Sequence, residues 1–216
     1  MKNSYYKHIL IIGCILATFI LFVIFVYLPA ADKAGNTSKA AHSLWPSPNF
    51  REPVKEVPQF SFTDQAGKIR TQDDIKGKVS VADFFFTSCE AACPMMKTEL
   101  TKVQKAFAKE DDFRILSFAL DPEDSIPVLK SFAEAYNANN DKWFFLSGNV
   151  KDVYDLGEQG FMQIVKDKEG NFEGHSQKFT LVDKNNMIRG FYLGTDSGEV
   201  ANLINDISYL LDKEQK

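Results

Sequence analysis

One stretch of the sequence indicates the fold most clearly: Val79-Ser-Val-Ala-Asp-Phe-Phe-Phe-Thr-Ser-Cys89-Glu-Ala-Ala-Cys93-Pro94. Its first part is short and almost entirely apolar, which is typical of a buried central strand. From Pro94 to about Lys109, apolar side chains recur at helical spacing. They are Met96, Leu100, Val103 and Phe107. A buried strand is therefore predicted to pass directly into a helix, with two cysteines at the junction.

Strand-like and helix-like segments alternate on both sides of this junction. Predicted strands, read from short alternating or apolar runs, cover residues 59–63, 79–86, 113–120, 143–146, 161–165, 178–182 and 187–192. Predicted helices cover residues 94–109, 126–136, 149–159 and 197–211, and a polar loop is predicted over 166–177. This alternation, followed by a hairpin and a last helix, indicates an α/β sandwich with a mixed central sheet.

An uncharged apolar run lies near the N-terminus of the 216-residue chain, at residues 9–28. At a rise of about 1.5 Å per residue, a helix of this length spans a bilayer core of roughly 30 Å. The run is longer than the apolar part of a cleavable signal peptide, and Leu28-Pro-Ala-Ala31 is a poor cleavage site, so an uncleaved anchor is preferred to the alternative, a cleaved signal peptide. We therefore expect a cytoplasmic tail at 1–8 and a single-pass transmembrane anchor at 9–28. Cys14 is expected to be an inert cysteine inside that helix.

The rest of the chain is predicted to lie on the extracytoplasmic side of the membrane. Lys2 and Lys7 favour a cytoplasmic tail, because positive charges tend to stay on that side. Residues 29–57 are rich in Ala, Ser, Asn, Lys and Pro, which is typical of a tether. Residues 58–216 are long enough for one domain with its own core. We expect a bacterial cytoplasmic (inner) membrane protein whose domain faces the extracytoplasmic, periplasmic side.

The charge balance gives no reason to expect nucleic-acid binding. Without Lys2 and Lys7, 23 of the 25 basic residues remain beside all 29 acidic residues, so residues 29–216 carry a net charge of −6. A moderately acidic domain without a basic cluster lacks the electrostatic footprint of a nucleic-acid-binding protein.

The two cysteines of the predicted domain, Cys89 and Cys93, lie where a helix begins. Free N–H groups and the positive end of the helix dipole stabilise a thiolate there, and the thiolate is the form that attacks disulfides or binds metals. Pro94 suits the first helical position. The structural alternative is a plain disulfide, but so small a loop would restrain the unfolded chain little.

One of the three histidines is placed to join the cysteines. His8 flanks the apolar run and His42 lies in the predicted tether, so we expect neither to be functional. His175 lies three residues before the predicted strand 178–182, and we expect that strand to be a neighbour of the one that leads to Cys89. The alternative is an exposed histidine in a polar loop.

Three motifs, in this order, resemble the Sco/SenC family over about residues 50–212. They are Phe84-Phe-Phe-Thr-Ser-Cys89-x-x-x-Cys93-Pro94, Asp121-Pro-Glu-Asp124, and His175-Ser176 with Asp183 eight residues on. The resemblance implies a thioredoxin-like fold and copper, as Cu(I) or Cu(II), held by Cys89, Cys93 and His175. It also implies a role in assembling the dinuclear copper (CuA) site of cytochrome c oxidase.

The residue chemistry agrees with this resemblance, with two departures. Two thiolates and an imidazole suit copper in its lower oxidation state, or zinc. Family members often carry Pro after the first cysteine and Asp before the histidine, whereas this chain has Glu90 and Gly174. The missing carboxylate beside His175 puts the affinity for copper, and for Cu(II) in particular, in question.

Three functional hypotheses follow. The first is a copper metallochaperone that serves the copper-bearing subunit of an oxidase or another copper or thiol client. The second is a thiol–disulfide reductase in which Cys89 and Cys93 are the redox-active, catalytic pair. The third is a copper or redox sensor. A peroxidase is a weaker enzymatic alternative, because the Cys–His set does not require one.

Four neighbouring side chains receive a structural interpretation. Met95 and Met96 follow the cysteines and are expected to pack in the core rather than bind copper. Asp121 and Asp124 are candidates either to orient a metal ligand or to cap the next helix. The cap is the preferred interpretation for Asp124.

Overall fold

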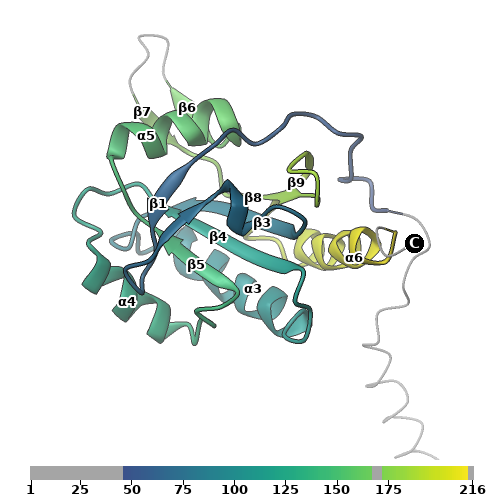
Figure 1. Cartoon of the computed structure of the whole chain (residues 1–216), viewed down its shortest axis with the longest axis horizontal. Helices are drawn as coiled ribbons and strands as arrows, with labels where there is room; N and C mark the ends of the chain where they lie inside the picture. The colour runs from purple at the N-terminus through teal and green to yellow at the C-terminus, as the bar shows by residue number, and fades with distance from the viewer. Residues whose placement is uncertain (1–45, 167–171, 214–216) are drawn as a thin grey trace, which may run out of the picture. The chain divides into compact units, whose positions relative to one another are not determined.

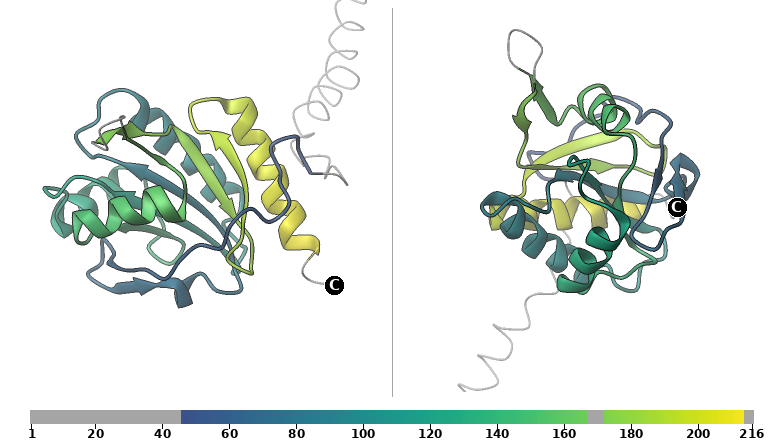
Figure 2. Two further views of the ribbon diagram at one scale, coloured as in Figure 1. Left: turned by 90° about the horizontal axis from the view of Figure 1, so that it is seen from above. Right: turned by 90° about the vertical axis from the view of Figure 1, so that its left-hand side faces the viewer.

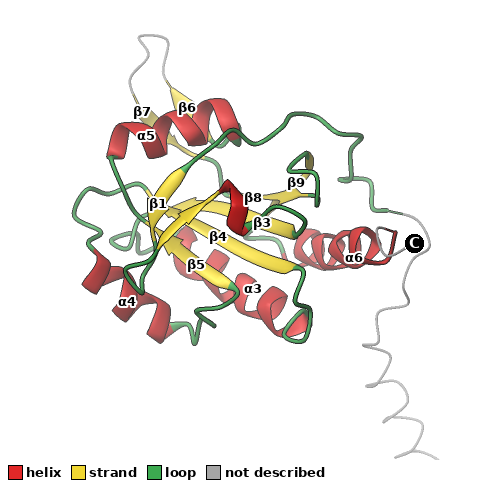
Figure 3. Cartoon of the chain, in the orientation of Figure 1, coloured by secondary structure: helices red, strands yellow, loops and turns green. Residues whose placement is uncertain are grey.

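The computed structural model describes residues 46–166 and 172–213, which lie in one compact unit, Leu44–Lys216. Its strands are β1 Ser61–Thr63, β2 Ile69–Thr71, β3 Val79–Phe85, β4 Phe113–Ala119, β5 Trp143–Leu146, β6 Ile164–Lys166, β7 Phe172–His175, β8 Lys178–Val182 and β9 Ile188–Leu193. Its helices are η2 Gln72–Asp74, α3 Ala92–Ala106, α4 Ile126–Ala135, α5 Val150–Asp155, the π turn η3 Leu156–Gly160, and α6 Ser197–Lys213. Figures 1 and 3 show their arrangement.

A five-stranded sheet in the order β5-β4-β3-β8-β9 forms the centre of the domain. β3 is parallel to β4, and β4 to β5, whereas β8 runs antiparallel to both β3 and β9. The predicted mixed sheet is confirmed. The expectation that strand 178–182 neighbours the strand leading to the cysteines is also confirmed, since Leu181 pairs with Val81.

Both faces of the sheet are covered, so the chain has two hydrophobic cores (Figure 2). Side chains alternate along β3: Val81 and Phe85 face the core shared with α3, α4 and α6, while Ala82 and Phe84 face the opposite core. The opposite core is closed by α5, β1 and the segment that precedes β1. The cysteine-bearing α3 therefore packs on the first face.

The packed part of the chain begins before the predicted domain start at Pro58. Residues 46–57, assigned to the tether, run beside β9 with isolated bridges from Phe50 to Gly190 and from Glu56 to Met187. Gly190 is required by this close approach, because a Cβ there would lie 2.9 Å from the carbonyl oxygen of Asn49. The segment pairs with the free edge of β9 and covers it.

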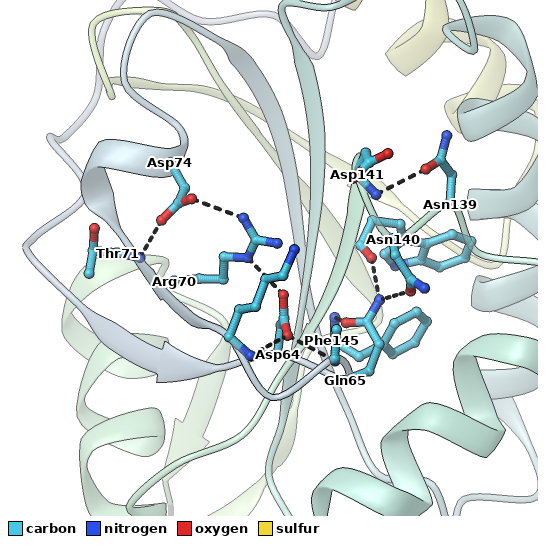
Figure 4. A network of polar contacts seen from close by, with 12 residues as sticks. Asp64, Gln65, Arg70, Thr71, Asp74, Asn139, Asn140, Asp141 and Phe145 are labelled. Carbon is cyan, nitrogen blue, oxygen red and sulfur yellow. Dashed lines mark hydrogen bonds and ion pairs between the residues drawn. The ribbon is translucent and has the colours of Figure 1, made fainter.

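The other edge of the sheet, β5, is capped by a side chain. Gln65 is buried; its amide accepts a hydrogen bond from the N–H of Phe145 and donates to the carbonyl of Trp143, both at 2.8 Å. Figure 4 shows this contact beside the ion pair of Arg70 with Asp64. Backbone groups of an edge strand that would otherwise be open to another chain are thus satisfied within the domain.

Around the β6–β7 hairpin, which carries His175, two predicted boundaries differ from those in the structure. The strand predicted at 161–165 begins at Ile164, because η3 extends the preceding helical segment to Gly160. Part of the polar loop predicted over 166–177 is the strand β7, which pairs with β6. The sequence pattern missed β7 because Glu173, Gly174 and His175 are not typical strand residues.

The described helices include none with the length and apolarity needed to cross a bilayer. The predicted tail at 1–8, the anchor at 9–28 and most of the tether lie outside the described residues.

Candidate metal centre

A short loop between β3 and α3 carries the first cysteine, and the first turn of α3 carries the second. Cys89 is half-buried and Cys93 is 1% exposed, and both are free thiols. The N–H of Cys89 donates to the carbonyl of Phe86 at 3.3 Å, which closes a tight turn at the end of β3. The structure therefore confirms the predicted location of both cysteines at the mouth of a helix.

The sulfur of Cys89 lies in a cradle of hydrogen-bond donors. Burial alone would raise the pKa of this thiol, but the backbone N–H groups of Cys93, Ala91 and Ala92 and the thiol of Cys93 all donate to its sulfur. Together they bring the pKa of Cys89 below its ordinary value. Because N–H groups at a helix start have no partner within the helix, this is the thiolate stabilisation that the sequence predicted.

Cys93 has the opposite character. Burial, together with the neighbouring Cys89, raises the pKa of Cys93 to about 12, although a backbone hydrogen bond with Phe86 and the charge of Lys97 act against this rise. In the metal-free dithiol, Cys89 therefore ionises first, and Cys93 keeps its proton and donates it in a hydrogen bond. The pair titrates as a coupled unit.

A buried ion pair lies beneath the cysteines. Lys97 of α3 and Asp83 of β3 are both 0% exposed, and their charged atoms are 2.6 Å apart. Ser117 accepts from Lys97 at 2.9 Å and donates to Asp83 at 2.5 Å, and Trp143 Nε1 also donates to Ser117. Every charged group in this network has a partner, which is the condition under which buried charges are tolerated.

Sequence reasoning missed Lys97, although two signals for it exist. Asp83 is the one charge inside an apolar strand, and an isolated buried carboxylate requires a partner. Lys97 lies four residues after Cys93, on the helix face that also carries Leu100. Together, the two signals indicate a buried lysine on the helix face that packs on β3.

The cysteine loop is also tied to the loop that precedes α4. The N–H of Thr87 donates to Asp124 at 3.2 Å, and the Thr87 hydroxyl donates to the other carboxylate oxygen. Burial raises the pKa of Asp124, an effect that the bonds from Thr87 oppose. The cap interpretation of Asp124 is therefore wrong: α4 begins after Ser125, and no side chain caps it. Asp121 accepts from the N–H of Glu123 and stabilises the turn.

His175 is the last residue of β7, and its ring packs on Phe86 with the ring centroids 5.4 Å apart. Burial lowers the pKa of His175, while the carbonyl of Ser176 and the charge of Asp83 raise it and Lys97 lowers it. The imidazole is therefore neutral at pH 7. His175 and Cys93 both interact electrostatically with Lys97, so both lie within electrostatic range of the same buried pair.

The structure brings the predicted ligands together only in part. Cys89 and Cys93 hydrogen-bond to each other, and Phe86 contacts both Cys93 and His175. Within residues 46–166 and 172–213, no three histidine, cysteine, aspartate or glutamate side chains are grouped closely enough to hold a metal ion. The assignment of all three residues to one metal ion remains a prediction.

The neighbouring methionines differ from each other. Met96 is 1% exposed in the core shared by α3 and the sheet, as predicted. Met95 is 53% exposed, so the prediction that it packs in the core is wrong. Glu90, one of the departures from the family pattern, is exposed, and a side chain at Gly174, the other departure, would meet open space.

The donor set suits a soft metal ion. One sulfur is stabilised as a thiolate, a second thiol is adjacent, and a neutral imidazole lies across one aromatic ring. Thiolate and imidazole are the ligands that Cu(I) and zinc prefer. In the absence of a metal, the same two thiols can close a disulfide.

Comparison with known proteins agrees with these features. A family model described as SCO1/SenC matches residues 49–212. The SCO1 protein homolog of Bacillus subtilis (strain 168) is 36% identical over 163 residues, which cover 73% of this chain and 84% of that protein.

Solved structures give the same result. BsSco, a member of the Sco family of cytochrome c oxidase assembly proteins in which a disulfide switch was identified, matches with a TM-score of 0.64 and 34% identity, over 75% of this chain and 97% of its own. Bradyrhizobium japonicum ScoI with copper bound matches with a TM-score of 0.58 and 21% identity, over 72% of this chain and 99% of its own. At this identity, the match shows a shared fold only. The implied thioredoxin-like fold with a mixed sheet is confirmed. This chain belongs to the SCO1/SenC family.

Proposed function

We propose that this chain is a copper-binding assembly factor that carries copper, as cargo, to the CuA site of a cytochrome c oxidase. In this proposal Cys89, Cys93 and His175 hold the ion. The observation that carries the proposal is the pair of adjacent thiols at the start of α3, one of them stabilised as a thiolate. The description of BsSco as a cytochrome c oxidase assembly protein supports it.

The three residues have unequal tasks in taking up copper. Cys89 is the half-buried sulfur and the first to ionise, so it makes the first contact with an incoming ion. Cys93 must then lose its proton, because a thiolate is the binding form. His175 supplies a neutral nitrogen, and soft sulfur ligands select copper in its lower oxidation state.

Copper stoichiometry tests this proposal. The purified full-length chain should hold one copper ion per chain, with an absorption spectrum that changes on loading. His175→Ala should lose most of that copper, whereas His42→Ala, the matched control outside the ligand set, should retain it. Equal retention of copper by wild type and His175→Ala would remove His175 from the site.

A second candidate function is thiol–disulfide reduction, which the unequal pKa values of the two cysteines favour. The Cys89 thiolate would attack a client disulfide to form a mixed disulfide and release one client thiolate. Deprotonated Cys93 would then attack the Cys89 sulfur, which frees the second client thiolate. Two electrons pass to the client, and the chain ends as a disulfide that a thiol reductant must reduce again.

Single substitutions distinguish copper delivery from disulfide reduction. Disulfide turnover by a reductase should survive His175→Ala and stop with Cys89→Ser. Copper delivery should fail with either variant. Deletion of the gene should lower the copper content of the oxidase, whereas a copper or redox sensor would leave oxidase assembly intact.

We also propose that residues 9–28 anchor the chain in a bacterial cytoplasmic membrane, with the domain on the extracytoplasmic side. The uncharged apolar run and the lysines of the tail support this proposal. External protease should digest the domain in cells whose outer layers are opened, while a cytoplasmic control protein survives. Full protection of the domain would contradict this orientation.

A further inference from the structure

A buried amide lies at the base of the hairpin that carries His175. Gln163 is 1% exposed and directly precedes β6, whose Ile164 pairs with His175 of β7. β6 and β7 form a two-stranded sheet separate from the five-stranded one. The contacts that join Gln163 to the central sheet therefore determine the position of the His175 imidazole.

Gln163 uses its backbone and its side chain to join three elements. Its N–H donates to the carbonyl of Gly157 in η3 at 2.7 Å. Its side-chain nitrogen donates to the hydroxyl of Thr180 at 2.8 Å, and Thr180 is a fully buried residue of β8. Its side-chain oxygen accepts from the hydroxyl of Ser176, and its carbonyl accepts from the N–H of Ser176 at 2.7 Å.

Ser176 in turn determines which imidazole nitrogen is free. The Nδ1 atom of His175 lies 3.0 Å from the carbonyl oxygen of Ser176. A carbonyl can only accept, so in the neutral ring Nδ1 carries the hydrogen and Nε2 keeps the lone pair. Ser176 thus orients the ring with Nε2 available as a metal ligand.

The backbone conformation of Met162 indicates that the position of the next residue, Gln163, is strongly constrained. Met162 is not a glycine, yet its φ of 54° lies in the left-handed region, and its side chain is 43% exposed. Such a conformation persists only where the surrounding structure enforces it. The hydrogen bonds of Gln163 to Gly157, Ser176 and Thr180 impose this constraint.

We propose that Gln163 is a positioning residue that, through Ser176, fixes the tautomer of His175 and keeps Nε2 ready to bind copper. The claim that Nε2 binds copper rests on the proposed function, whereas the claim about the tautomer of His175 does not. Groups behind a metal-binding histidine commonly change metal affinity by about 10–100-fold when they are removed. The hydrogen bonds of the Gln163 side chain go to Ser176 and Thr180, so Gln163 acts on His175 through these neighbours.

The test is nitrogen NMR of the metal-free, full-length chain labelled at its three histidines, followed by Cu(I) competition. Gln163→Leu keeps the bulk of the side chain but removes both side-chain hydrogen bonds. Thr180→Val is a milder second variant that removes only the anchor on β8. Gln65→Leu is the matched control, because Gln65 is another buried amide with comparable bonds at the far edge of the sheet.

Wild type and Gln65→Leu should show His175 as the Nδ1–H tautomer. Gln163→Leu should show a mixture of tautomers and bind Cu(I) about tenfold more weakly, with Thr180→Val intermediate. A His175 tautomer and a Cu(I) affinity in Gln163→Leu equal to those of Gln65→Leu would overturn the inference. If wild type bound no copper at all while the tautomer still shifted in Gln163→Leu, the copper function would fail and the positioning role would stand.

Discussion

Cys93 and His175 are candidate ligands of the same metal ion, but the molecule holds them in different ways. Cys93 lies on α3, packed on the central sheet beside the buried pair of Lys97 and Asp83. His175 lies on a separate two-stranded sheet, which hydrogen bonds of Gln163 join to β8. The thiol half of the site is therefore held by the core beneath α3, whereas the imidazole half depends on the hydrogen bonds of Gln163 together with the buried Ile164 and the ring of Phe86.

This difference indicates how the two halves can contribute to function. Changes to the core beneath the cysteines should affect folding and the site together. Changes to the polar residues around the hairpin should affect metal binding while the central sheet remains intact, because β6 and β7 form a separate two-stranded sheet. Copper affinity can thus be adjusted on the hairpin without loss of the dithiol.

The largest expected effect lies at the thiol half. Cys89→Ser should abolish both copper retention and disulfide turnover, because it removes the more acidic sulfur. Copper analysis and a disulfide-reduction assay on the purified chain provide the measurement. Copper retained at one ion per chain in this variant would contradict the assignment. Cys14→Ser, which changes the cysteine outside the domain, is the control and should behave like wild type.

Loss of the cation beneath the cysteines should be the next largest effect. Lys97→Met leaves the carboxylate of Asp83 buried without its counter-charge, which should lower the free energy of unfolding by about 3–5 kcal/mol. Denaturant unfolding measures this loss. Lys102→Met, which breaks an exposed pair with Glu99 on the same helix, is the control and should change stability by less than about 1 kcal/mol. Equal stability of the two variants would show that the buried pair contributes nothing.

Copper affinity should rise with pH. The pKa of Cys89 is lowered and that of Cys93 is raised to about 12, so between these values the metal-free site carries one proton, on Cys93. Binding releases that proton, which makes the affinity increase about tenfold per pH unit. Below the pKa of Cys89 a second proton is released and the slope doubles. An affinity for Cu(I) that is independent of pH from 7 to 9 would contradict the protonation of Cys93.

The smallest expected effect concerns the hairpin. Gly174→Asp adds the carboxylate that many family members carry, and the structure leaves open space for it. Cu(II) should bind about tenfold more tightly, while Cu(I) affinity changes little because soft ligands dominate it. Ile69→Asp, the same added charge at a remote exposed position, should leave both affinities unchanged. Equal Cu(II) binding by all three proteins would show that position 174 does not reach the metal.

The sequence predicts the thiol half of the site better than the imidazole half. An apolar strand followed by helical periodicity places Cys89 and Cys93 correctly, because both patterns follow directly from burial. β7 could not be predicted in the same way, since its residues lack a strand pattern and its pairing with β6 is a tertiary contact. The roles of Gln163 and Asp124 depend on partners distant in sequence, Thr180 and Thr87, which no local pattern indicates.

The segment before β1 illustrates the same limit. Its composition is typical of a linker, yet residues 46–57 pair with β9 through backbone hydrogen bonds, which leave no recognisable pattern in the side chains. Gly190 was the available signal, because a glycine inside a strand often marks the close approach of another backbone.

X-ray absorption at the copper edge of the Cu(I)-loaded full-length chain tests the central claim most directly. Two sulfur scatterers and one nitrogen scatterer should surround the copper in wild type, and the nitrogen should be absent in His175→Ala. A nitrogen contribution that is unchanged in the variant, or a wild-type site with sulfur alone, would contradict a copper centre built from both halves of the molecule.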